Sequence, residues 1–344
     1  MRYGKFLPEK GTIGFVAPSF GCNIEPYKSA FLHAQEKWIE EGYQLSPGPN
    51  AYEGRGIGIS NTPEKCAREF QEWYAKKDVD ILISCGGGEL MCEILPKLDF
   101  DKIKEEEPKW FMGYSDNTNL TFLLATLCDT AAVYGPCAAA FGMEPWHKSL
   151  QDAMEILRGE RFFVKNYEKW EKEGLKSEEN PFEPYHVTEE FRLHALNPQG
   201  EEKEFLVKGR LLGGCLDSLA TLCGTRFDKV REFNKRYEED GVLWFLEACD
   251  LNIMGIRRAL WQLKNAGWFD TARGFLIGRP YCFGEEGFGI DQYTAVTDVL
   301  SELQVPIIMD LDIGHLPPMM PLVCGSLAKA EIRENSISIM MEYK

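Results

Sequence analysis

Short apolar runs alternate with amphipathic stretches along most of the chain. The runs predict buried strands at residues 11–18, 43–45, 79–84, 110–113, 206–212, 241–246, 275–277 and 306–309. Apolar residues that recur every three or four positions predict helices over residues 26–41, 62–77, 89–95, 118–127, 216–222, 253–266 and 292–303. This alternation indicates an α/β fold built from parallel βαβ units, with sites at the carboxyl ends of the strands.

A charged stretch over residues 161–205 interrupts the pattern. It is rich in turn formers and carries Trp170, Phe182 and Tyr185 among Glu and Lys. Structureless loops of this length are uncommon, which favours a partly structured, functional connection, and a solvated linker with incidental aromatic residues is the alternative. The predicted organisation is an N-terminal domain, a connection and a C-terminal domain at residues 1–160, 161–205 and 206–344.

Composition narrows the class of protein. The 344 residues are 44% apolar and 27% charged, as in ordinary globular proteins. A formal charge of −16 argues against a nucleic-acid partner, because such binding relies on Lys and Arg. No run approaches about 20 apolar residues and the N-terminus has no apolar core, so we expect a cytoplasmic protein with no membrane partner. The eleven cysteines lack a C-x-x-C pair and the five histidines do not cluster, so no metal and no cofactor are predicted.

Ser115 stands where a predicted strand turns into a predicted helix. Gly113 gives room for a tight turn, and the helix start offers N–H groups without intrahelical partners. This pattern is typical of a nucleophile elbow, although Asn117 replaces the second glycine of G-x-S-x-G. A serine beside Asp and Asn at a helix start is also a common N-cap, so both roles are open.

Glu247 and His315 are the candidates for the acid and the base that a serine nucleophile needs. Glu247 ends a buried strand, where an unpartnered carboxylate is costly, but Asp250 or a merely solvated Glu247 is the alternative. His315 lies in a Gly/Pro loop, where a plain turn residue is the alternative. Because the other four histidines lie in helical or linker contexts, His315 is the best candidate for the base.

The glycine turn of Gly86, Gly87 and Gly88 follows a buried strand, so its backbone N–H groups are available to a ligand. It does not continue as G-x-G-x-x-G, because Met91 occupies the last glycine position, and this disfavours a nucleotide cofactor. An oxyanion hole is the better functional use, with one N–H near Gly87 and one from Asp116. A simple tight turn is the alternative.

Taken in order, these motifs resemble the serine LD-carboxypeptidase family and its microcin-C-immunity branch. The matching stretches span nearly the whole chain and include residues 13–19, 95–99, 113–116, 134–136, 213–214, 245–247 and 314–315. The resemblance assigns the catalytic serine, glutamate and histidine to Ser115, Glu247 and His315. It assigns the oxyanion donors to the turn near Gly87 and to the N–H of Asp116.

The resemblance also implies a fold and a partner. We expect an N-terminal flavodoxin-like parallel sheet with helices on both faces, a C-terminal β-rich α/β domain, an active site between them and a homodimer. Gly88-Glu89 departs from the family pattern, which leaves open the substrate contacts of the turn at Gly86 and Gly88. The connection resembles that of the microcin-immunity branch, where an aromatic loop packs on a nucleobase, and the alternative role for Trp170 is to anchor the loop.

The function that follows is a serine carboxypeptidase that cleaves an amide bond next to a free carboxylate through an acyl-enzyme. The leading substrate is a small peptide, the murein tetrapeptide of cell-wall recycling. The alternative substrate is a peptidyl or aminoacyl nucleotide. A non-catalytic flavodoxin-like protein that binds a ligand is the alternative from another class.

Overall fold

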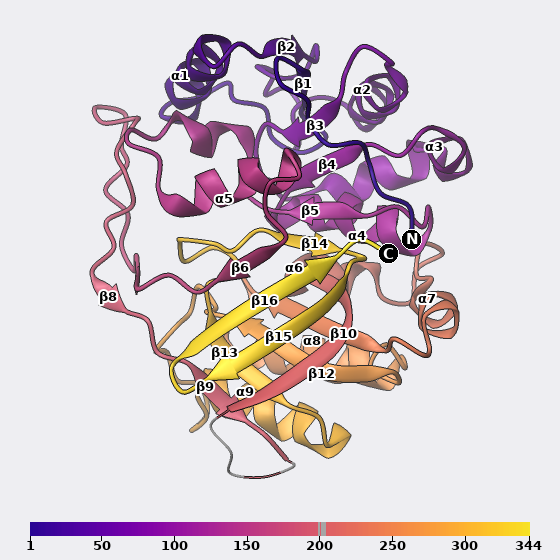
Figure 1. The fold of residues 1–344 in the computed structure, drawn as a ribbon, viewed down its shortest axis with the longest axis vertical. Helices are drawn as coiled ribbons and strands as arrows, with labels where there is room; N and C mark the ends of the chain where they lie inside the picture. The colour runs from indigo at the N-terminus through magenta and orange to yellow at the C-terminus, as the bar shows by residue number, and fades with distance from the viewer. Residues whose placement is uncertain (199, 201–203) are drawn as a thin grey trace.

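A six-stranded sheet forms the upper half of the molecule in Figure 1. The computed structural model describes residues 1–198, 200 and 204–344. The strands of this sheet are β1 (Thr12–Val16), β2 (Gln44–Pro47), β3 (Ile81–Ser84), β4 (Trp110–Gly113), β5 (Ala132–Tyr134) and β14 (Leu322–Cys324). The five N-terminal strands are parallel in the order β2-β1-β3-β4-β5, and β14 pairs antiparallel with β5. This order is that of flavodoxin, which confirms the predicted fold.

Helices cover both faces of the first sheet, as the complete burial of β3 and β4 requires. They are α1 (Tyr27–Glu40), α2 (Pro63–Ala75), α3 (Phe100–Glu105), α4 (Thr118–Thr126) and α5 (Lys148–Leu157), with 3₁₀ turns η1 (Met91–Lys97), η2 (Ser115–Asn117) and η3 (Ala138–Gly142). The α-helix predicted over residues 89–95 is wrong in type and position, because η1 stands there. Pro96 lies inside η1, and proline disrupts the hydrogen bonds of a regular α-helix.

An eight-stranded mixed sheet forms the lower half. Its spatial order is β6 (Phe163–Lys165), β16 (Ser336–Glu342), β15 (Leu327–Arg333), β10 (Glu204–Cys215), β11 (Val242–Glu247), β12 (Ala272–Gly278), β13 (Ile307–Leu311) and β9 (His194–Leu196). The strands β10 to β13 are parallel and the others antiparallel. The helices of this half are α6 (Leu216–Leu222), α7 (Val230–Arg236), α8 (Ile253–Asn265), α9 (Gln292–Leu300) and the 3₁₀ turn η4 (Ser301–Leu303).

The connection at 161–205 contributes strands to the second sheet. β6 and β9 form its two edges, and β7 (Lys169–Trp170) pairs with β8 (Glu189–Glu190) between them in sequence. Four residues of this predicted connection, Gln199, Glu201, Glu202 and Lys203, lie outside the described residues.

Helix α4 joins the two halves. All nine of its residues are buried, as expected for a helix covered on every side. It contacts β4 and β5 of the first sheet as well as β10 and α6 of the second half (Figure 1). Because α4 begins directly after η2, its packing fixes Ser115 at the junction of the two sheets. No described helix is both long and apolar enough to span a bilayer.

Candidate active site

Ser115 occupies a strained turn between β4 and α4. Its φ is +64°, a left-handed conformation that is uncommon for a residue other than glycine. The Asn117 amide holds the turn by donating hydrogen bonds to the carbonyl oxygens of Gly86 at 2.9 Å and Tyr114 at 3.0 Å. A Cβ on Gly113 would lie 2.8 Å from the Asn117 side chain, so only glycine fits there. The predicted elbow geometry is therefore present, and Ser115 is half-buried.

His315 and Glu247 meet Ser115 although they come from distant parts of the chain. The Nε2 atom of His315 lies 2.8 Å from the Ser115 Oγ, and its Nδ1 lies 2.8 Å from Glu247 Oε2. Since a carboxylate only accepts, Nδ1–H donates to Glu247 and Nε2 is left to accept the serine hydroxyl. Gly314 permits this approach, because its φ is +104° and a Cβ there would lie 2.5 Å from Glu247 Oε2.

Tyr134 completes the surroundings of Glu247 and is a residue that sequence reasoning missed. Glu247 is only 1% exposed, and its Oε1 accepts a hydrogen bond of 2.5 Å from the Tyr134 hydroxyl. The same hydroxyl accepts the Ser115 N–H at 3.3 Å. Both carboxylate oxygens are thus satisfied, as a buried charge requires. The available signal was a tyrosine at the end of a buried strand, whose hydroxyl needs a partner.

The electrostatic balance at His315 favours its protonated form. Burial by itself lowers the pKa of the imidazole, but the Glu247 carboxylate and the hydrogen bonds of Glu247 and Cys249 outweigh it. The pKa of His315 is therefore raised well above its usual value. An imidazolium that forms when the histidine takes a proton from Ser115 would be stabilised here.

The glycine turn approaches the serine closely. A Cβ on Gly87 would lie 3.3 Å from the Ser115 Cβ, and the Gly87 N–H donates no hydrogen bond to a described residue. Asp116 follows Ser115 at the start of η2, where N–H groups lack partners within the helix. Its carboxylate points away from this role, since it accepts hydrogen bonds from Ser19 and Met91. Burial raises the pKa of Asp116 to about 6.

Two pockets flank Ser115. The acidic pocket has about 420 Å³ of empty space, part of it open to solvent, and its lining includes Ser115, Gly88, Glu89, Asn119, Asp217 and Asp250. The aromatic pocket has about 740 Å³ of empty space, also partly open to solvent, and its lining includes Gly86, Gly87, Tyr27, Tyr114, Lys176 and Tyr185. The glycine turn separates them, because Gly86 and Gly87 face one pocket and Gly88 the other. Lys176 and Tyr185 bring the connection to the site, and sequence reasoning gave neither of them a role.

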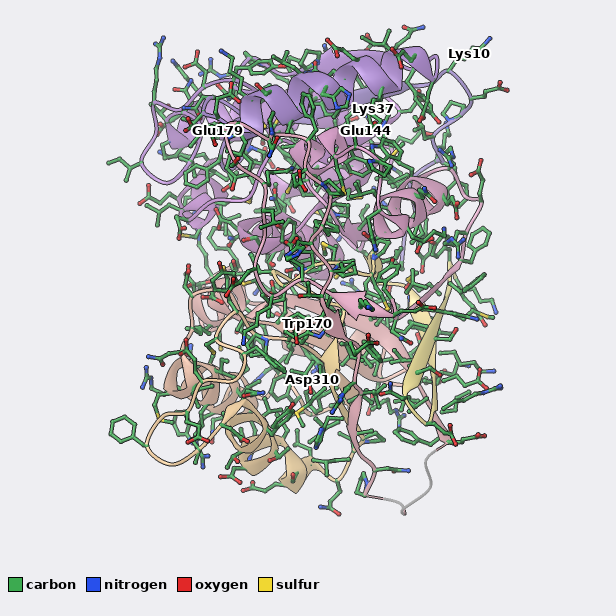
Figure 2. All side chains as sticks on the ribbon, turned by 90° about the vertical axis from the view of Figure 1, so that its left-hand side faces the viewer. Lys10, Lys37, Glu144, Trp170, Glu179 and Asp310 are labelled. Atoms are coloured by element: carbon green, nitrogen blue, oxygen red, sulfur yellow. The ribbon has the colours of Figure 1, made fainter. Side chains whose placement is uncertain are left out.

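Trp170 lies in β7, at mid-height of the molecule in Figure 2, and lines neither pocket. It is 5% exposed, with its ring centroid 5.2 Å from that of Phe283 and 4.8 Å from the Arg279 guanidinium. Arg279 in turn forms a buried ion pair with Asp312. These contacts favour the anchoring role for Trp170 over direct contact with a substrate.

A metal centre has no support in this region. Within the ranges that the structure describes, no three His, Cys, Asp or Glu side chains are grouped closely enough to hold a metal ion. The geometry around Ser115 is instead that of a hydroxyl, an imidazole and a carboxylate in a chain of hydrogen bonds.

Comparison with known families assigns the flavodoxin-like layer and the second mixed sheet to a peptidase family. Residues 13–135 match the LD-carboxypeptidase N-terminal domain, and residues 208–330 match the LD-carboxypeptidase C-terminal domain. The chain belongs to the LD-carboxypeptidase family.

Relatives of known identity extend over almost the full chain. The microcin C7 self-immunity protein MccF of Escherichia coli is 27% identical over 340 residues, which cover 96% of this chain and 94% of MccF. The solved structure of MccF with aspartyl sulfamoyl adenosine is 25% identical, with a TM-score of 0.80. That of MccF with glutamyl sulfamoyl guanosine is also 25% identical, with a TM-score of 0.81. Both alignments cover 99% of this chain and 98% of the solved one.

Proposed function

We propose that the protein is a serine carboxypeptidase that hydrolyses an amide bond through an acyl-enzyme on Ser115. The observation that carries this proposal is the unbroken chain from Glu247 through His315 to the Ser115 Oγ, with both contacts at 2.8 Å. His315 takes the hydroxyl proton as Ser115 attacks the carbonyl carbon, and later gives it to the leaving amine. Glu247 orients the imidazole and stabilises its charged form.

The tetrahedral intermediate needs donors for its oxyanion. In our proposal these are the backbone N–H groups of Gly87, which approaches Ser115 closely, and of Asp116, which follows it in the chain. Each such donor is typically worth about 3 kcal/mol of transition-state stabilisation. After the amine leaves, water attacks the acyl-enzyme by the same route and releases the acid.

The leading substrate is a murein tetrapeptide that loses its C-terminal D-amino acid, a free carboxylate lying next to the cleaved bond. Membership of the LD-carboxypeptidase family supports this choice. A cytoplasmic location, a role in cell-wall recycling and a homodimer stay predictions of the sequence.

A peptidyl or aminoacyl nucleotide is the second candidate substrate. It is supported by the likeness to MccF, whose solved complexes contain aminoacyl sulfamoyl nucleosides. The aromatic pocket beside the glycine turn adds support, because Tyr27, Tyr114 and Tyr185 offer ring surfaces for a nucleobase.

Kinetics of Ser115→Ala test the enzyme against the non-catalytic alternative. A peptidase should lose several orders of magnitude in kcat, whereas a protein that only binds its ligand keeps its affinity and has no turnover to lose. Murein tetrapeptide and aspartyl sulfamoyl adenosine should be assayed side by side with the wild-type protein. Cleavage of the nucleotide alone would rule out the murein substrate, and turnover by Ser115→Ala equal to wild type would rule out the proposed nucleophile.

A further inference from the structure

The acidic pocket has an unbalanced charge. Glu89, Asp217 and Asp250 line it together with Ser115, and none of its described lining residues is Lys, Arg or His. None of these three carboxylates forms an ion pair within the part of the chain that the structure describes. A substrate bound to Ser115 must therefore lie in or beside a negative field, which the charge of His315 at the Ser115 hydroxyl opposes in part.

Asp217 is held rigidly in this field. Its two carboxylate oxygens accept backbone N–H groups of Cys249 at 3.1 Å, Asp250 at 3.0 Å and Leu251 at 3.1 Å. These bonds tie the start of α6 to the segment that follows Glu247. The negative charge is therefore a fixed feature of the pocket rather than a mobile surface group.

Glu89 and Asp250 are exposed, and they face the pocket from opposite halves of the molecule. Partial burial raises the pKa of Glu89, and repulsion from Asp250 and Asp217 raises it further. Three carboxylates thus converge from three separate segments on a space beside the nucleophile. Like charges gathered in this way disfavour a substrate carboxylate.

A second observation also indicates a ligand that donates hydrogen bonds. Asn119 lines the same pocket, is 1% exposed and donates from Nδ2 to the backbone oxygen of Asp116 at 2.9 Å and to its carboxylate at 3.0 Å. Those two acceptors fix the amide orientation. Its Oδ1 has no hydrogen-bond partner among the described residues, although buried acceptors are nearly always paired.

We propose that the acidic pocket binds a positively charged group of the substrate, an ammonium or guanidinium on the residue beside the cleaved amide. This inference rests on the proposed function, since it takes Ser115 as the nucleophile. Such a group brings several N–H donors, which match both the carboxylates and the free acceptor of Asn119. The substrate carboxylate then lies elsewhere, and Lys176 of the aromatic pocket is the one cation among the described lining residues of the two pockets.

Substrates that differ only in one side chain test this proposal. Two series of peptides carry lysine, norleucine or glutamate, one series on the acyl side of the cleaved bond and the other on the amine side. The series that varies the residue bound in the acidic pocket should respond, and the other should not. In that series, the wild-type kcat/KM should be at least about tenfold higher for lysine than for norleucine, and lowest for glutamate. The preference should weaken as salt is added, because the carboxylates are partly exposed.

The double variant Glu89→Gln with Asp250→Asn removes two of the four carboxylates that line the pocket, the others being Asp217 and Asp116. Since one exposed ion pair changes binding by at most about fivefold, KM for the lysine substrate should rise about tenfold. KM for the norleucine substrate, which has no positive charge to pair with these carboxylates, should rise much less. The matched control is Glu93→Gln, which removes an exposed carboxylate four residues from Glu89 that does not line the pocket.

Failure of this inference can be told apart from failure of the proposed function. Equal kcat/KM for lysine and norleucine in both series, or a lysine preference that the double variant keeps, would overturn the cationic subsite while hydrolysis still stands. Turnover that survives in Ser115→Ala would overturn the proposed function instead. Calorimetry with Ser115→Ala then measures binding of the same peptides without cleavage, and its order of affinities should again be lysine, norleucine, glutamate.

Discussion

In the proposed mechanism, the chemistry of the site depends on Glu247. Its carboxylate is buried, accepts one hydrogen bond on each oxygen and raises the pKa of His315. The base form of His315 must be present for Ser115 to lose its proton. Activity should therefore fall as the pH drops through the raised pKa of His315.

Glu247→Gln should change both the rate and its pH dependence. Without the negative charge the pKa of His315 falls, so the acid limb of the kcat/KM profile should move to lower pH. The limiting kcat should fall roughly 10⁴-fold, because the imidazole loses the partner that fixes its tautomer. A pH–rate profile measures both effects, with Glu93→Gln as the control for net charge. An acid limb that stays in place would contradict the role given to Glu247.

The three residues of the candidate site were predictable from the sequence. The residues that hydrogen-bond to them or line the pocket beside them, Tyr134 and Asn119, were not. Ser115 and Glu247 each follow a run of buried apolar residues, where a polar side chain stands out, whereas His315 is one of only five histidines and lies in a Gly/Pro loop. Tyr134 and Asn119 lie inside apolar segments. The bond from Tyr134 to Glu247 forms only when strands of the two sheets come together, whereas Asn119 bonds to Asp116 three residues earlier.

At the scale of elements, the described part of the connection at residues 161–205 links the second sheet to the aromatic pocket. We call this part the strap. Its edge strands β6 and β9 belong to the second sheet, whereas Lys176 and Tyr185 reach the aromatic pocket beside Gly87. Trp170 holds the start of this strap against Phe283 and Arg279. The strap is thus built into the fold at several points along its length.

Trp170→Ala should loosen the strap as a whole. Loss of a buried tryptophan typically costs about 3–5 kcal/mol of unfolding free energy, which denaturant titration would measure. Cleavage of the murein and the nucleotide substrates should decline together. Tyr185→Ala provides the comparison, since it removes a ring that lines the aromatic pocket. A loss confined to the nucleotide substrate in Trp170→Ala, with unchanged stability, would instead support base stacking by Trp170.

Helices and strands whose apolar residues recur with a clear period were predictable. Short strands that form only by pairing with a distant strand were not. Helix α6 and strand β4 have the predicted bounds. The strands β6 to β9 are only two or three residues long, so their apolar pattern carries no signal and their pairing partners lie far away in sequence. Pro96 is visible in the sequence, but the sequence does not show that the segment around it forms a 3₁₀ turn.

At the scale of the whole molecule, the two halves share one core. β14, which comes near the end of the chain, completes the first sheet, and α4 of the N-terminal region is buried against β10. The division into residues 1–160, 161–205 and 206–344 stays a prediction of the sequence. Crossing contacts of this kind arise only in the folded chain, so no local pattern could have indicated them.

This shared core predicts one cooperative unfolding transition. Differential scanning calorimetry should give a single peak, with an enthalpy of about 240 kcal/mol for a chain of this length. Gly214→Ala should lower the melting temperature of that one peak, because a Cβ there would lie 2.6 Å from the Thr118 side chain on α4. Two resolved peaks, of which the variant shifts only one, would contradict a common core.

Covalent labelling shows whether Ser115 is the nucleophile and His315 its base. The protein is treated with a fluorophosphonate, and the modified residue is identified by peptide mass spectrometry. One adduct per chain should form on Ser115 in the wild-type protein, and labelling should slow by orders of magnitude in His315→Ala. An adduct on another residue, or an unlabelled Ser115 in a protein that still hydrolyses its substrate, would contradict the account.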